Sequence, residues 1–184
     1  ITLEQGYFAT AAQALKPWLV EVYQSLHQYP ELSGQEFGTC RRIKSFLTEN
    51  GIVPDENFAE PAVVAMLRGI MGDHVVALRA DMDALPIREN SGVPFSSHHE
   101  GIMHACGHDA HVAMLLGAAR LLQARQSELP GHVRLIFQPS EEKHPGGALA
   151  LIEQGVLESP PVEAIFGQHV QTHIPVGKLG IMSG

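Results

Sequence analysis

The chain has 184 residues, 45% of them of hydrophobic type, which is enough to bury a core of ordinary domain size. Twelve basic and twenty acidic residues give a formal charge of -8 with no Lys/Arg cluster, which argues against a nucleic-acid partner and an anionic membrane surface. No apolar run approaches the roughly 20 residues that a membrane helix needs, so we expect a soluble, cytoplasmic protein.

The cysteine and histidine content further limits the kind of protein that this sequence can encode. Two cysteines, Cys40 and Cys106, are fewer than a secreted disulfide scaffold of this length usually carries, so both are predicted to be free thiols. Cys40 falls in a helical pattern and is expected to be a small buried residue. The chain also has eleven histidines, many of them close together, and this bias favours a metal-binding interpretation.

Helical spacing of apolar residues alternates with strand-type runs along the chain. The first helix stops before Pro30, and Asn50-Gly51 closes the second. In chain order we predict helices over 4–28 and 36–49, strands over 63–67 and 74–79, a long helix over 107–125, a strand over 133–137, a helix over 146–154 and a strand over 164–170. This alternation predicts an α/β fold with a layered, mostly parallel sheet and helices on both faces.

Residues that can carry chemistry gather where the predicted strands end. Asp81 and Asp83 follow the run VVALRA, Glu141 and Glu142 follow VRLIFQPS, and His169 lies at the end of AIFGQHV. Ligand sites of open α/β sheets lie beyond the carboxyl ends of their strands. We therefore expect a site at that edge of the sheet.

The segment HACGHDAH, at the start of the long helix, adds soft donors. Cys106 and His108 flank Gly107, so both side chains can turn toward one point, and both are good ligands for zinc and neighbouring transition metals. The alternative interpretation is that His104 and His111 are surface residues and that Cys106 is a buried thiol.

The carboxylates also allow two interpretations each. Of Glu141 and Glu142, one can bind a cation while the other reaches a metal-bound water, although an adjacent pair is often a solvated surface feature. Asp81 and Asp83 share one side of an extended segment, where either can ligate a metal, hold a ligating imidazole or cap a loop. Combined with the thiolate and imidazole donors, they form a set suited to one or two divalent metals.

Five segments carry a resemblance to a known family. They are LHQYPELSGQE, ALRADMDALPI, MHACGHDAH, IFQPSEE with GGA, and GQHVQTHIPVG with KLG, and they run from about residue 26 to the end. In order and spacing they resemble the dinuclear-metal amidohydrolase and peptidase family of hippurate hydrolases, N-acyl-amino-acid amidohydrolases and auxin-conjugate hydrolases. The resemblance implies a zinc-peptidase type of fold. It also implies that residues 1–184 are the N-terminal part of the catalytic domain. A dimerising lid domain and the C-terminal part of the catalytic domain, with a last ligating His, are expected outside this chain.

The resemblance also implies a ligand set and two catalytic groups. Cys106 would bridge two metal ions, and the further ligands would be His108, Glu142 and His169. Glu141 would be the general base, and Asp83 the carboxylate that orients a ligand or tunes that base. Asp81 stands where broader relatives carry a ligating His, a departure that fits the thiolate-containing branch, which draws on His108 instead.

The expected activity is hydrolysis of the amide bond of N-acyl amino acids or small peptides by a metal-bound hydroxide. Two divalent ions, drawn from zinc, manganese, cobalt or nickel, would serve one active site. The expected partners are this small-molecule substrate and, through the lid domain, a second copy of the protein. The start at Ile1 rather than Met predicts a trimmed or excised chain, and this piece alone is expected to be inactive. Two alternatives stay open: a non-catalytic metal-binding α/β module and a thiol hydrolase whose nucleophile is Cys106.

Overall fold

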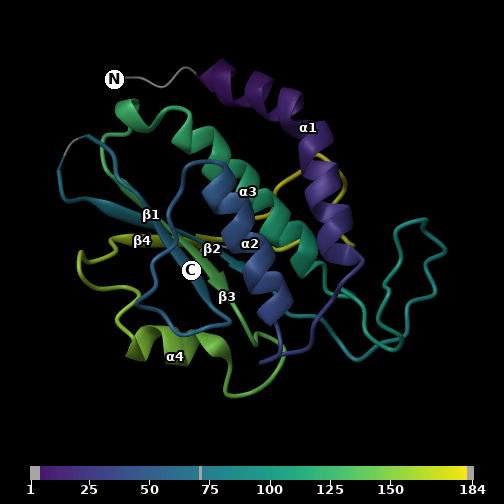
Figure 1. The fold of residues 1–184 in the computed structure, drawn as a ribbon. Coiled ribbons are helices and arrows are strands. Elements are labelled where there is room, and N and C mark those ends of the chain that lie inside the picture. The colour runs from purple at the N-terminus through teal and green to yellow at the C-terminus, as the bar shows by residue number, and fades with distance from the viewer. Residues whose placement is uncertain (1–4, 71, 182–184) are drawn as a thin grey trace.

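The structure, a computed structural model, describes residues 5–70 and 72–181 (Figure 1). The helices are α1 (Gln5–His27), α2 (Phe37–Glu49), α3 (His108–Gln123) and α4 (Gly147–Glu153), with a 3-10 turn η1 (Gln126–Glu128). The strands are β1 (Val63–Leu67), β2 (Val75–Asp81), β3 (His132–Gln138) and β4 (Ala164–Gly167). Every predicted helix and strand is present, and most boundaries agree within about two residues.

The four strands form one mixed sheet in the order β1-β3-β2-β4. β2 pairs in parallel with both β3 and β4, and β1 alone runs antiparallel, against β3. Helices α1, α2 and α3 lie on one face of the sheet, while α4 lies on the other (Figure 1). The predicted α/β fold with a mostly parallel sheet and helices on both faces is confirmed.

Alternation along the strands divides the core between the two faces. In β1, Val63, Ala65 and Leu67 join the larger buried cluster, which contains side chains of α1, α2 and α3. Val64, between them, points to the opposite face and joins a smaller cluster with Leu151 of α4. The apolar stripe of each helix is thereby matched to one face of the sheet.

Strand β4 is shorter than predicted and lies at an edge of the sheet. Its ladder with β2 ends at the pair Arg79 and Gly167, so residues 168–170 lie in the segment that follows. In that segment the Val170 N–H donates to the side chain of His111 and not to a neighbouring strand. Among the described residues, no helix is both long enough and apolar enough to cross a membrane.

Candidate metal centre

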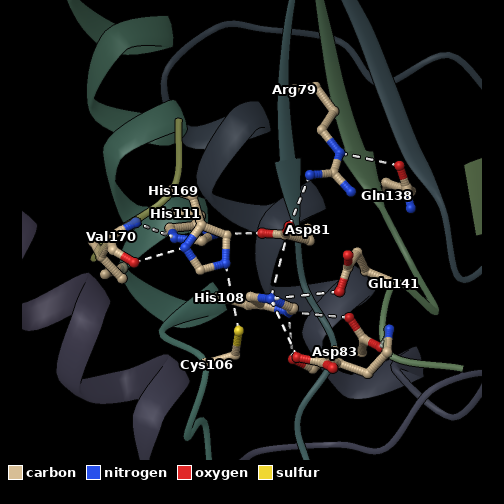
Figure 2. A network of polar contacts seen from close by, with 12 residues as sticks. Arg79, Asp81, Asp83, Cys106, His108, His111, Gln138, Glu141, His169 and Val170 are labelled. Carbon is tan, nitrogen blue, oxygen red and sulfur yellow. Dashed lines mark hydrogen bonds and ion pairs between the residues drawn. The ribbon is translucent and has the colours of Figure 1, made fainter. Parts of the chain in front are cut away.

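The predicted site residues meet at one edge of the sheet (Figure 2). β2, β3 and β4 are parallel, so their carboxyl ends share this edge, and α3 begins beside it. Asp83 lies two residues after β2, Cys106 and His108 lie at the start of α3, Glu141 and Glu142 follow β3, and His169 lies two residues after β4. The structure therefore brings together residues that are far apart in the sequence.

His108 is at the centre of this cluster and is fully buried. Its Nδ1 donates hydrogen bonds to the backbone carbonyl of Asp83 at 3.0 Å and to Asp83 Oδ1 at 3.1 Å. Because a carbonyl oxygen can only accept, the ring proton is assigned to Nδ1, and Nε2 keeps its lone pair. No group among the described residues hydrogen-bonds to this buried Nε2. A buried lone pair without a partner fits a bound cation.

Acidic groups surround His108 Nε2 at distances suited to a shared ion. The nitrogen lies 3.7 Å from Asp81 Oδ2, 3.7 Å from Glu142 Oε1 and 4.0 Å from Glu141 Oε2. Ligand atoms that bind one ion at about 2.0–2.3 Å are themselves separated by roughly 3–4 Å. His108 belongs to three sets of donors, and in each set the ligand atoms lie within 4.8 Å of one another. Its partners are Cys106 and His169 in the first set, Glu141 and Glu142 in the second, and Asp81 and His111 in the third.

Cys106 and His169 form the second half of the cluster. Sγ of Cys106 lies 3.4 Å from Nε2 of His169, whose Nδ1 donates to the carbonyl oxygen of Val170 at 2.6 Å. This tautomer again leaves Nε2 with a lone pair directed at the site. Burial, followed by the neighbouring Glu142 and Glu141 carboxylates, raises the pKa of the Cys106 thiol to about 12. A cation held by this cluster would offset the negative charge of the two carboxylates and stabilise the thiolate.

Asp83 connects His108 to the loop that carries the two glutamates. Its Oδ1 accepts from His108, and its Oδ2 accepts from Ser33 Oγ at 2.7 Å and from the Glu142 backbone N–H at 2.9 Å. Burial alone would raise the pKa of Asp83, but these donors outweigh burial and lower it. These contacts are what an orienting carboxylate requires, and the role itself stays a prediction.

A second buried carboxylate, which the sequence did not single out, supports the same loop. Glu36 is fully buried, and its Oε1 accepts the Ser140 backbone N–H at 2.7 Å. Ser140 has φ of 54°, a left-handed conformation that costs energy for a residue other than glycine. Burial raises the pKa of Glu36. Glu36 therefore helps to hold the backbone immediately before Glu141 and Glu142.

Some expectations about the neighbouring residues were wrong or incomplete. The alternative that placed His104 and His111 on the surface fails, because both side chains are buried. Cys106 is half-buried rather than buried. Ser33 and Glu36 lie in the segment LHQYPELSGQE, which was recognised from the resemblance but given no role, and only that resemblance could have drawn attention to them.

Comparison with known proteins places this arrangement in a family. The sequence profile of peptidase family M20/M25/M40 matches residues 77–184, more than half of the chain, including every predicted site residue. The chain belongs to the M20/M25/M40 peptidase family. It is 44% identical to N-acetyl-L-cysteine deacetylase of Bacillus subtilis over 184 residues, which is 100% of this chain and 44% of that protein. It is 43% identical to thermostable carboxypeptidase 1 of Saccharolobus solfataricus over 172 residues, 92% of this chain and 43% of that protein.

A solved structure of an M20 family member has the same fold. The crystal structure of the Bacillus subtilis YxeP protein, described as a dinuclear metal-binding peptidase from the M20 family, superposes with a TM-score of 0.87 at 43% identity. The match covers 94% of this chain and 48% of that one. The chain thus spans about half the length of the relatives that it matches.

Proposed function

We propose that this chain is the N-terminal part of the catalytic domain of a metal-dependent amidohydrolase, which cleaves the amide bond of N-acyl amino acids or small peptides. The observation that carries the proposal is the buried Nε2 of His108, which has no hydrogen-bond partner in the described part of the chain and faces carboxylate oxygens at 3.7–4.0 Å. Membership of the M20/M25/M40 family and the similarity to a deacetylase and a carboxypeptidase support it.

Four residues are proposed as ligands of two divalent ions. Cys106, His108, Glu142 and His169 would hold the ions, and the close spacing of their ligand atoms supports this set. The mixed thiolate, imidazole and carboxylate set suits zinc, manganese, cobalt or nickel. The last ligand is proposed to come from outside these 184 residues.

The proposed reaction divides the work between the two adjacent glutamates. When bound, the ions supply Lewis-acid chemistry, which lowers the pKa of a water molecule and polarises the amide carbonyl. The Glu141 side chain is 43% exposed, so a substrate can reach it. Glu141 takes the proton of the attacking water as the new C–O bond forms, and returns it to the amine nitrogen as the C–N bond breaks. Asp83 keeps His108 in its tautomer and holds the Glu142 backbone beside it.

Assembly and location are part of the same proposal. We infer a cytoplasmic protein, because Cys40 and Cys106 are both free thiols. We also infer a homodimer formed through a lid domain that lies outside this chain. The length of the relatives supports the existence of further domains, since this chain corresponds to 44% and 43% of two of them.

A thiol hydrolase is the second candidate, because Cys106 Sγ and His169 Nε2 are only 3.4 Å apart. An activated cysteine needs a lowered pKa, whereas burial and the two glutamates raise that of Cys106. The thiol interpretation also leaves Glu141, Glu142 and the His108 lone pair without a purpose. The metal-dependent reaction accounts for all of them.

The test is hydrolysis of a panel of N-acyl amino acids by the full-length protein with and without chelator. We expect chelation to abolish activity, added metal to restore it, and the Glu141→Gln and Cys106→Ala variants to lose at least about 100-fold in kcat/KM. Glu153→Gln, which changes an exposed carboxylate on α4, is the matched control and should behave as wild type. Activity that survives both chelation and Glu141→Gln would overturn the proposal in favour of the thiol enzyme or another site.

A further inference from the structure

A continuous chain of hydrogen bonds links Asp81, at the end of β2, to Nδ1 of His169, the ring nitrogen on the side away from Cys106 (Figure 2). Nδ1 of His111 pairs with Oδ1 of Asp81, and Nε2 of His111 accepts the Val170 backbone N–H at 3.0 Å. The carbonyl of the same Val170 accepts from His169 Nδ1 at 2.6 Å. The N–H of Val170 is therefore bonded by His111, while the carbonyl of Val170 bonds the ring of His169.

The partners of His111 determine its tautomer. A backbone N–H can only donate, so His111 Nε2 must be the acceptor and the ring proton must lie on Nδ1, from which it is donated to Asp81. The other carboxylate oxygen of Asp81 accepts from Arg79 Nη1 at 2.7 Å. Both nitrogens of His111 are thus engaged. Although its ligand atom lies within 4.8 Å of those of Asp81 and His108, His111 has no lone pair free for a metal ion.

Packing brings the same segment close to α3. The rings of His111 and His169 lie 4.5 Å apart, centroid to centroid, in an edge-on arrangement. A Cβ at Gly107 would come within 2.5 Å of Val170 Cγ2, so only glycine allows this close approach. Because the β4 ladder ends at Gly167, no strand pairing holds Val170, which is 42% exposed. The buried His111 ring is the anchor of this otherwise exposed segment.

We propose that His111 is a positioning residue for the metal centre. It fixes the Val170 peptide, and this peptide in turn keeps His169 in the tautomer and orientation that direct Nε2 at Cys106. The inference rests on the proposed function, since it takes His169 as a metal ligand. It assigns His111 a function that acts through the backbone of another residue rather than through the ion.

Two substitutions separate this role from simple packing. The amide of a glutamine extends to the place of imidazole Nε2, so His111→Gln can still accept the Val170 N–H. The shorter His111→Asn has its amide at the place of Nδ1, so it can bond Asp81 but reaches no atom toward Val170. His132→Asn is the control for the substitution itself, because it makes the same change in another ring that bonds a backbone N–H, that of Gly69 at 3.1 Å, at the opposite end of β3 from the site.

The experiment measures metal binding to the full-length protein by chelator competition with zinc, and the Co²⁺-to-thiolate absorption of the cobalt-loaded protein. We expect His111→Asn to lose about 10–100-fold in affinity for one of the two ions and to change the cobalt spectrum. His111→Gln should stay within a few-fold of wild type in affinity and keep its spectrum, and so should His132→Asn. Urea unfolding of the metal-free proteins checks that the His111 variants are folded.

The measured metal affinities distinguish failure of the positioning role of His111 from failure of the proposed metal-dependent function. If the wild-type protein binds no zinc or cobalt, the proposed function itself fails. If wild type binds two ions and His111→Asn binds both as tightly, the positioning role is overturned. Equal losses in His111→Asn and His111→Gln would also overturn it, because the contact with Val170 would then not be what matters. If His111→Asn does not fold, a loss of metal affinity in His111→Gln overturns the role; if His111→Gln does not fold, unchanged affinity in His111→Asn overturns it.

Discussion

Replacing His27 by glutamine should remove a pH-dependent part of the stability of the protein. His27, the last residue of α1, places Nδ1 2.6 Å from Asp109 Oδ2 and Nε2 3.1 Å from Glu89 Oε1. All three side chains are buried, with exposed fractions of 8%, 2% and 4%. The hydrogen bond to Asp109, opposed by burial and supported by Glu89, raises the pKa of His27 to about 9.

The raised pKa fixes the sign and the size of the effect. The protonated His27 stabilises the folded state fully below the unfolded pKa of 6.5, and this contribution disappears as the pH rises through about 9. At about 1.4 kcal/mol per pKa unit, the shift from 6.5 to about 9 corresponds to an upper bound of about 3 kcal/mol. Glutamine can donate a hydrogen bond to one carboxylate but carries no charge, so the variant should lack this dependence.

Urea unfolding followed by circular dichroism at about pH 6 and about pH 10 measures the difference. Between these values the wild-type protein should lose up to about 3 kcal/mol more unfolding free energy than His27→Gln, because other titrations are common to both. His99→Gln is the matched control, since the His99 ring bonds the Pro30 carbonyl and not a carboxylate. Equal pH slopes in wild type and His27→Gln would refute the assignment of a buried, charged imidazole.

Two further substitutions test the packing around the site and in the core. Gly107→Ala places a methyl group 2.5 Å from Val170 Cγ2 at a residue with φ of 87°, so zinc should dissociate more readily in a chelator competition. Unchanged zinc affinity would show that the approach of Val170 does not matter. Leu135→Ala empties a fully buried position in β3 and should lower the unfolding free energy by about 3 kcal/mol in urea. A loss below about 1 kcal/mol would mean that the core collapses around the cavity.

Local patterns in the sequence were sufficient for the elements but not for all of their pairings. Apolar periodicity located the α-helices and strands of the described residues, though not the short turn η1, because burial on one face imposes a period that is visible in a single chain. The antiparallel direction of β1 was not predicted, since the run VVAML reads alike in either direction of pairing. The early end of β4 was missed for a related reason. Its ladder ends at Arg79 although β2 continues to Asp81, and Val170 bonds the side chain of His111 instead, a tertiary contact that the residues of β4 do not record.

The site was predictable to the extent that its donors lie at strand ends. Asp83, Glu141 and His169 could be grouped because parallel strands bring their carboxyl ends to one edge. The supporting contacts could not be found in this way. Ser140 and Glu36 are 104 residues apart in the chain, and no local pattern marks a backbone N–H that needs a buried carboxylate. Such pairs are defined only by the tertiary fold.

The position of β2 explains why two aspartates stand at its end. β2 is the strand between β3 and β4, so carboxylates at its carboxyl end can reach the loops that follow both neighbours. Asp83 holds the Glu142 backbone on the β3 side, and Asp81, through His111, holds Val170 on the β4 side. Each aspartate also bonds one imidazole, and each contact leaves a defined nitrogen lone pair on the far side of the ring. Their spacing of two residues lets both face the site, so a change to either should disturb the loop on its own side of β2 more than the other.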